Sequence, residues 1–313
     1  MSNPSAADVQ VGVLKNIWEH YRAYANTSVR LKTQQGRWRS WLLVASIVAL
    51  LVTPFAKTFD KLDLGTVSRI LTVVATVLFS LMAWFHREVL GDDSEQPWVR
   101  SRQTGEGLKA LAFRFLGGVK PFDTPGSDAA LRQAEELRKE AAIAPDSVTA
   151  EEAQKNIPPA PLTILGYVKL RVDDQIDFYA KAIDRARKSN DRIVDIGRAI
   201  SAAVVVFGAL GALISKDWRD IWTPALGAAA TLATAQNARA RLRFLIDSYS
   251  TAMSKLKFAK TRWDVSAKKP EDDIQLVETA EGILAAENAG WVQQMLLKPV
   301  VPDQPATATA GRP

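Results

Sequence analysis

The sequence predicts an all-α membrane protein in which two transmembrane helical hairpins, four spans in all, extend into cytoplasmic antiparallel helical coiled-coil segments. Three observations predict this class: paired apolar runs without charged residues, heptad-spaced apolar residues around the second pair, and basic residues at the ends of the runs. The 313 residues include no cysteine, which excludes disulfides and thiolate metal sites. The net charge of +6 indicates an anionic partner, either nucleic acid or an anionic lipid surface.

The first pair of apolar runs, Trp41–Ala56 and Ile70–Phe85, organises the chain. Each run is about 16 residues long, and a few flanking residues extend it to the roughly 17–25 that a membrane span needs. Trp38 and Trp41 stand beside arginines at the start of the first run, a combination typical of the cytoplasmic membrane surface. The short runs also leave a second interpretation open, because the buried core helices of a soluble bundle can be equally apolar.

The second pair of apolar runs, Ala199–Ser215 and Ile221–Ala235, lies between two heptad stripes. The stripes include Val172, Ile176, Tyr179 and Ile183 before the pair, and Leu242, Ile246, Tyr249, Met253, Leu256 and Trp263 after it. We expect the two stripes to run side by side as an antiparallel pair of helices beyond the membrane. Lys260 interrupts the second stripe, and we expect its stem to pack while its ammonium reaches water. A final helix, about Asp272–Leu297, is expected to dock on this pair.

The layout of cytoplasmic helix, hairpin and return helix occurs twice. We therefore divide the chain into a first unit at 1–118 with spans at about 39–56 and 69–86, a linker at 119–162, a second unit at 163–297 with spans at about 198–215 and 220–236, and a disordered tail at 298–313. Clustered prolines indicate the linker, in which Thr149 and Glu152 resemble a capping box. The basic ends of the hairpins place both termini in the cytoplasm.

One polar pattern within the spans has two interpretations. Ser68, Thr72, Thr76 and Ser80 recur every four residues along the second run, and the fourth run offers Thr231 and Thr234. Such hydroxyls can bond to their own helix or across to another one, or they can line a water-filled path.

Signatures of catalysis are missing from the sequence: we find no phosphate-binding glycine loop, no nucleophile elbow and no zinc-binding helix. We therefore expect no enzyme activity, no cofactor and no metal. We also expect no nucleic-acid partner, because no aromatic platform interleaves the basic run of Arg185, Arg187, Lys188 and Arg192.

Several local strings resemble the SLATT domain family, the SMODS and SLOG-associating two-transmembrane effector domains. In the first unit these residues are Trp98, Arg102, Glu106, Lys109, Phe113, Arg114 and Phe115, and in the second they are Tyr167, Arg171, Asp174, Gln175 and Tyr179. The resemblance covers most of the chain as two units in tandem. The first unit has no counterpart of the Arg-x-x-Asp-Gln string that begins at Arg171.

The resemblance implies a multi-pass effector of the bacterial inner membrane, acting in an anti-phage or conflict system. Such an effector is expected to assemble as a homo-oligomer in the lipid bilayer and to open a pore or perturb the membrane. Its cytoplasmic helices are expected to receive the trigger from a sensor or nucleotide-signalling partner protein. Two alternatives stay open: a non-conducting membrane scaffold that recruits a partner, and a soluble helical-bundle interaction protein.

Overall fold

The computed structural model describes residues 6–61, 63–88, 95–122, 128–214 and 242–296. These ranges contain helices and short connections without any strand, which confirms the all-α class. The helices are α1 (Ala6–Lys61), α2 (Gly65–Glu88), α3 (Gln96–Leu116), α4 (Ala129–Ala141), α5 (Ala150–Gln154), α6 (Ile164–Tyr167), the π-helix η1 (Val168–Asp173), α7 (Asp174–Ile214), α9 (Leu242–Asp264) and α10 (Pro270–Leu296). The fourth apolar run, with Thr231 and Thr234, lies outside the described residues.

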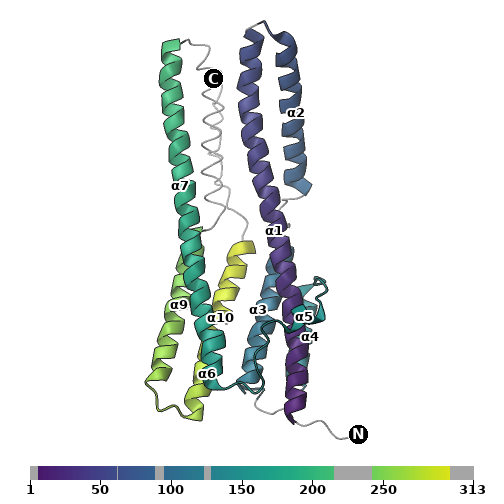
Figure 1. Cartoon of the computed structure of the whole chain (residues 1–313), viewed down its shortest axis with the longest axis vertical. Helices are drawn as coiled ribbons and strands as arrows, with labels where there is room; N and C mark the ends of the chain where they lie inside the picture. The colour runs from purple at the N-terminus through teal and green to yellow at the C-terminus, as the bar shows by residue number, and fades with distance from the viewer. Residues whose placement is uncertain (1–5, 62, 89–94, 123–127, 215–241, 297–313) are drawn as a thin grey trace, which may run out of the picture.

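Two long helices, α1 and α7, set the long axis of the molecule (Figure 1). At 1.5 Å per residue, the 56 residues of α1 extend about 84 Å and the 41 residues of α7 about 62 Å. The segment predicted as the first cytoplasmic helix and the first apolar run therefore form one continuous helix. Straight-chain helix formers such as Lys32, Gln34 and Arg37 join the two parts, and Gly36 costs only about 1 kcal/mol in a helix interior.

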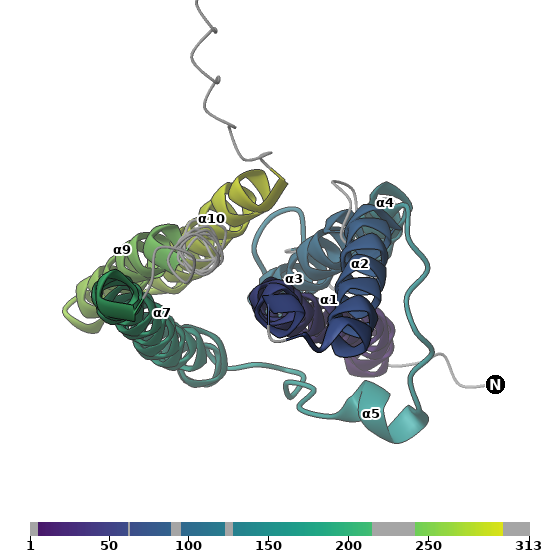
Figure 2. The same cartoon turned by 90° about the horizontal axis from the view of Figure 1, so that it is seen from above.

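The base of the molecule holds two groups of helices side by side: α1, α3 and α4 in one, and α7, α9 and α10 in the other (Figure 2). From this base the α1–α2 hairpin and the second half of α7 extend in the same direction (Figure 1). The apolar runs that the structure describes thus leave the base on one side, as two hairpins entering the same membrane would require.

Small residues form the contact between α1 and α2. Ala49 and Ala75 are buried there, and the Ser46 hydroxyl lies 3.2 Å from the Met82 sulfur. The outer face of the hairpin is apolar and exposed instead. Its side chains include Ile70, Val73, Val77, Phe79 and Trp84, each between 44% and 62% exposed.

The segment Gly65–Phe85 of α2 is long and apolar enough to cross a membrane, with a mean hydropathy of 1.8 and 11% of its residues buried. It is the one such segment found among the described residues, and the assignment rests on length and composition. The arrangement of four spans therefore stays a prediction.

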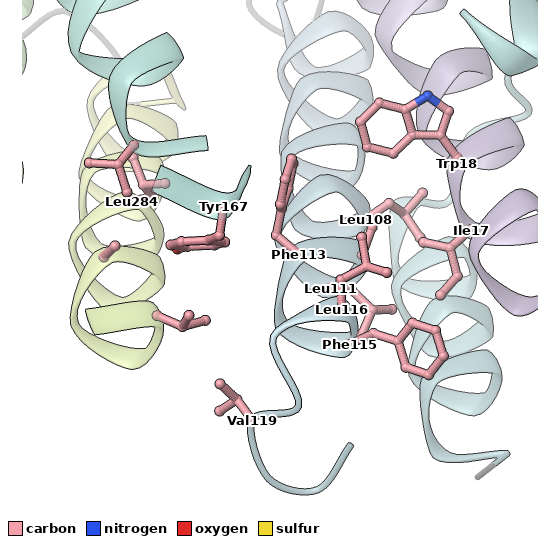
Figure 3. Close-up of a cluster of buried hydrophobic side chains, with 14 of the residues drawn as sticks. Ile17, Trp18, Leu108, Leu111, Phe113, Phe115, Leu116, Val119, Tyr167 and Leu284 are labelled. Atoms are coloured by element: carbon pink, nitrogen blue, oxygen red, sulfur yellow. The ribbon is translucent and has the colours of Figure 1, made fainter. Parts of the chain in front are cut away.

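The hydrophobic core lies in the base and runs through both groups of helices. Phe113 of α3 is at its centre: its ring meets Trp18 of α1 edge-on at 6.2 Å and Tyr167 of α6 edge-on at 6.0 Å. Figure 3 shows Leu108 and Ile17 on the α1 side of α3, while Tyr167 and Leu284 face Phe113 from the other group. The two groups are therefore joined by shared apolar packing.

The predicted antiparallel pairing of the two heptad stripes is confirmed in α7 and α9. The ring of Tyr179 lies 5.2 Å from that of Tyr249, and Asp173 meets Lys260 further along the pair. As expected, Lys260 lies at the rim of the pair with its side chain partly exposed, and its Nζ also donates to Asp173 Oδ1 at 2.6 Å. The antiparallel register brings an acidic residue to the position opposite this lysine.

The segment predicted as a linker packs along α1. The Trp18 indole donates to the carbonyl of Lys155 at 3.1 Å, and Tyr24 donates to the carbonyl of Ile143 at 3.2 Å. The capping box of Thr149 and Glu152 is confirmed at the start of α5. The connection between the two units is thus held against the first of them.

Candidate functional site: a charged interface between the two groups

Charged side chains gather where α3 faces the second group of helices, a layer that we call the charged interface. Its members are Arg102, Glu106 and Lys109 on α3, Arg171 and Asp174 on η1 and α7, and Glu281 and Glu287 on α10. The predicted docking of α10 on α9 is observed, and α10 also packs on α3. This second contact brings the charged side chains of both groups together.

Arg171 and Glu281 form a bidentate ion pair with both N–O distances at 2.8 Å, and their side chains are only 2% and 4% exposed. Tyr167 donates its hydroxyl to Glu281 at 3.1 Å, and the guanidinium lies 5.2 Å from the Phe113 ring. Burial lowers the pKa of Arg171, but the Glu281 carboxylate outweighs it and raises the pKa overall. The Arg171 guanidinium therefore stays charged in the core.

Arg102 carries the contact from α3 into the second group. Its guanidinium lies 3.9 Å from the ring centre of Trp291, and Nη2 is 3.5 Å from the Tyr249 hydroxyl. Trp98, one turn earlier on α3, meets Trp291 edge-on at 5.1 Å. A cation held over an indole is worth about 0.5–2 kcal/mol, so this contact helps to fix the position of α3 against α9 and α10.

Glu287 occupies the middle of the interface. The Tyr179 hydroxyl donates to Glu287 Oε2 at 3.2 Å, and Gln175 is buried one turn before Tyr179. Burial raises the pKa of Glu287, although the positive charge of Arg102 acts in the opposite direction. Burial therefore favours the protonated form of this carboxyl group more than water does.

Lys109 and Glu106 extend the electrostatic interactions of α3 to the helices on both sides of it. Burial and the nearby Arg171 lower the pKa of Lys109, whose ammonium is 3.8 Å from Asp174 at the solvent edge. Burial and, second, Glu106 raise the pKa of Tyr21 on α1 to about 12. Charges on α3 are thus coupled to α1 as well as to α7 and α10.

Six of the residues that carry the family resemblance come together at or beside this interface. Trp98, Arg102 and Glu106 follow one another at four-residue steps on α3, and Arg171, Asp174 and Gln175 lie on η1 and α7. The sequence strings from the two units therefore meet in space, although about 65 residues separate them along the chain.

The hydroxyl stripe of α2 lies away from the charged interface. Ser68 is buried, whereas Thr72, Thr76 and Ser80 are exposed on the outer face of the hairpin. Thr72 and Thr76 donate to the carbonyls four residues earlier, each at 2.9 Å. These two hydroxyls are therefore satisfied within their own helix, and they remain exposed to whatever surrounds the hairpin.

The acidic partners on α10 were not selected from the sequence. The signal was present: Val277, Glu281, Leu284, Asn288 and Trp291 recur at steps of four and three, with an acid on an otherwise mostly apolar face. A carboxylate on a helix face that packs in the core requires a buried cation as its partner. Arg171, beside the start of the first heptad stripe, was the candidate.

Among the described residues, no three His, Asp or Glu side chains are grouped to hold a metal ion. Positive and negative side chains face one another in the interface. The interface therefore acts as a polar contact that fixes the relative positions of the helices. The fold and this contact define the class: an all-helical protein with an apolar hairpin on a charged helical base.

Comparisons with known families give each half a match. Residues 167–291 match the model of the SMODS and SLOG-associating 2TM effector domain 1, or SLATT_1, and residues 20–129 match that of DUF4231, a protein family of unknown function. The resemblance to SLATT proteins is thus supported for the second unit, whereas the first matches a model with another name. No curated protein matches the chain, and no solved structure does.

Proposed function

We propose that the protein is a membrane-embedded effector whose hairpins cross the bilayer and whose helical base receives the activating signal. In this proposal copies of the chain assemble in the membrane and open a pore or perturb the lipid. The effector role and the presence of two spans per hairpin are supported by the description of the family that matches residues 167–291.

The exposed apolar face of the α1–α2 hairpin is the observation that carries this proposal. A core helix of a soluble protein with the hydropathy of α2 would be buried, yet only 11% of the apolar segment of α2 is. A contiguous exposed apolar surface of this kind indicates contact with lipid or with another protein. Lipid fits both hairpins, because the described apolar runs leave the base in one direction.

Charges at the two ends of the hairpin support its orientation. Arginines lie at the end nearest the base, whereas the opposite turn is mixed in sign. The arginines are Arg37, Arg39 and Arg87, and the turn carries Lys57, Asp60, Lys61 and Asp63. Basic residues are retained on the cytoplasmic side of a membrane, so the base is expected inside the cell.

The charged interface gives the signal a route to the membrane. A ligand that changes how α3 sits against α10 would move α1 and α7, which run unbroken from the base into the apolar region. To shift the base from one arrangement to another, such a ligand must bind one of the two arrangements more tightly than the other.

Depolarisation of cells that overproduce the protein is the direct test, measured with a potential-sensitive dye and accompanied by flotation of the protein with membranes. We expect the membrane potential to fall while the protein stays with the membrane fraction. An unchanged potential would refute the pore, and recovery in the soluble fraction without detergent would refute the membrane assignment.

Substitution of the hydroxyl stripe separates its two interpretations. If Thr72 and Thr76 line a conduit, Thr72→Leu and Thr76→Leu should abolish depolarisation and leave cross-linked oligomers intact. Val73→Leu, on the exposed face beside them, is the matched control and should conduct normally. Loss of oligomers together with depolarisation would assign the stripe to packing between copies.

A non-conducting scaffold is the second candidate, and one surface favours it. A groove of about 730 Å³ lies between α9 and α10 at the base, and Phe258, which is 72% exposed, forms part of its lining. A partner bound there would be recruited to the membrane without ion flux. Stable assembly in lipid with no change of membrane potential would support this function over the pore.

A further inference from the structure

A groove of about 550 Å³ lies on α1 below the start of the first apolar run. Its lining comprises Arg30, Thr33, Gln34, Arg37, Trp38 and Trp41. These positions recur at steps of three and four, so they share one face of a continuous helix. The groove therefore presents guanidinium, amide and indole groups in line, beginning at the point where the helix would enter lipid.

We infer that this groove binds the phosphate headgroup of an anionic phospholipid in the leaflet that faces the base. The inference rests on the proposed insertion of the α1–α2 hairpin. A guanidinium binds phosphate oxygens through paired N–H groups, and indole rings favour the headgroup level of a bilayer. The groove combines both groups on one surface.

Distances along the helix decide which arginine meets the phosphate. The interfacial layer on each side of a bilayer is about 5–8 Å thick, half the difference between its total and hydrocarbon thickness. With Trp41 at the hydrocarbon edge and a rise of 1.5 Å per residue, Arg37 is about 6 Å and Arg30 about 16 Å further from the bilayer centre. Arg37 lies within the layer, and Arg30 lies beyond it.

Ion pairs lead to the same choice. Arg30 makes a bidentate pair with Asp146 at 2.7 and 2.8 Å, and Arg39 is paired with Glu95. Arg37 is exposed, and the structure shows no ion pair for it among the described residues. Its guanidinium is therefore the one in the groove that is available to an anion.

The neighbouring helix fixes the aromatic wall of the groove. Trp38 lies 5.2 Å from Phe85 of α2, which in turn meets Trp84 edge-on at 5.0 Å. Because Thr33 donates to the Val29 carbonyl at 2.8 Å, its hydroxyl hydrogen is already engaged, and the N–H groups of Arg37, Gln34 and the two indoles are the donors left for a phosphate. A lipid bound here would contact the hairpin at its open end, near the base and beside the seam of α1 and α2.

Native mass spectrometry of the full chain in mixed micelles tests this inference, with dioleoyl-phosphatidylglycerol and dioleoyl-phosphatidylcholine as probes. We expect the first phosphatidylglycerol to bind about fivefold more tightly than phosphatidylcholine, the ratio for one arginine near an anionic lipid surface. Arg37→Gln should remove this preference. Two control variants each remove one positive charge at another position: Arg30→Gln in the same groove and Arg132→Gln on α4. Both variants should keep the preference for phosphatidylglycerol.

Equal binding of the two lipids by the native chain, or a preference that survives Arg37→Gln, would overturn the inference. A preference lost equally in all three variants would assign it to net charge and overturn it too. Displacement of the lipid by equimolar inorganic phosphate would identify a free-phosphate site instead. Flotation with phosphatidylcholine vesicles is the separate check: failure to float refutes the proposed function, whereas flotation without lipid preference refutes this inference alone.

Discussion

At the scale of residues, the ion pair of Arg171 and Glu281 has the largest energetic consequence. A buried pair is a weak source of net stability, because desolvation of both charges offsets their attraction. Removal of one partner is costly, however, since it leaves the other charge buried alone. The pair therefore makes the position of α10 against η1 specific, and Phe113 and Tyr167 complete its surroundings.

Glu281→Ala is expected to lower the free energy of unfolding by about 3–5 kcal/mol, because the Arg171 guanidinium would stay buried without a counter-charge. The measurement is chemical unfolding of the purified chain in detergent, followed by circular dichroism. Arg30→Gln breaks an exposed pair with Asp146 and should cost much less, because water screens both charges. If Glu281→Ala and Arg30→Gln had equal effects, burial would not be the reason why loss of the Arg171–Glu281 pair is costly.

Glu287 gives the base a dependence on pH. Its pKa is raised above 4.5 in the folded protein, chiefly by burial. The unfolded chain therefore releases this proton more readily, and stability falls as the pH rises from 4.5 through the folded pKa. Glu287→Gln keeps an acceptor for the Tyr179 hydroxyl and removes the titration.

We accordingly expect Glu287→Gln to raise the melting temperature at pH 8, and we expect this gain to shrink as the pH approaches 4.5. Thermal unfolding of both proteins in detergent at several pH values provides the measurement. Glu135→Gln, on the exposed surface of α4, is the control and should not reproduce this pH dependence. A constant difference between the two proteins at all pH values would argue against a titrating Glu287.

At the scale of elements, the hairpin of α1 and α2 depends on small residues at its seam. Ala75 is 6% exposed and lies next to Thr76, whose side chain is exposed. Substitutions at Ala75 and Thr76 therefore probe different faces of the same helix. Close approach of backbones through small side chains is the usual basis of helix packing in lipid.

Ala75→Leu is expected to destabilise the hairpin by about 1–3 kcal/mol, because the larger side chain overpacks the seam. Thr76→Leu adds a similar bulk on the outer face and should change the melting temperature little. Thermal unfolding in lipid nanodiscs compares the two. If Thr76→Leu were the more harmful change, the outer face would be a packed interface in the assembled protein.

At the scale of the whole molecule, the proposed topology places the base and the distal turn on opposite sides of the membrane. The chain contains no cysteine, so single cysteines can be introduced without background. Asp63→Cys reports on the turn between α1 and α2, and Lys257→Cys reports on the base.

In intact cells we expect a membrane-impermeant maleimide to label Asp63→Cys, with outer-membrane permeabilisation if needed, and to leave Lys257→Cys unlabelled. After lysis both should react. Labelling of Lys257→Cys in intact cells would reverse the orientation. If Asp63→Cys and Lys257→Cys were both protected in intact cells, a hairpin that crosses the membrane would be excluded.

The sequence was informative where a pattern repeats along one helix. Heptad steps located the α7–α9 pair, and Thr149 with Glu152 located the cap of α5. It was weaker where a contact joins distant segments: Arg171 and Glu281 each stand out within their own helix, but only the fold brings them together across 110 positions. The continuity of α1 is not marked in the composition, which changes from polar to apolar near Trp41, although nothing in the chain there stops a helix.

The unbroken length of α1 has a thermodynamic consequence for the activation of the protein. Because the same rod is packed in the base and extends into the proposed lipid region, its two ends do not rotate or tilt independently. Coupling free energies between sites are reciprocal. If a signal at the base alters the embedded part, then bilayer thickness and tension must alter the base's affinity for that signal, so the threshold for activation would be set in part by the membrane itself.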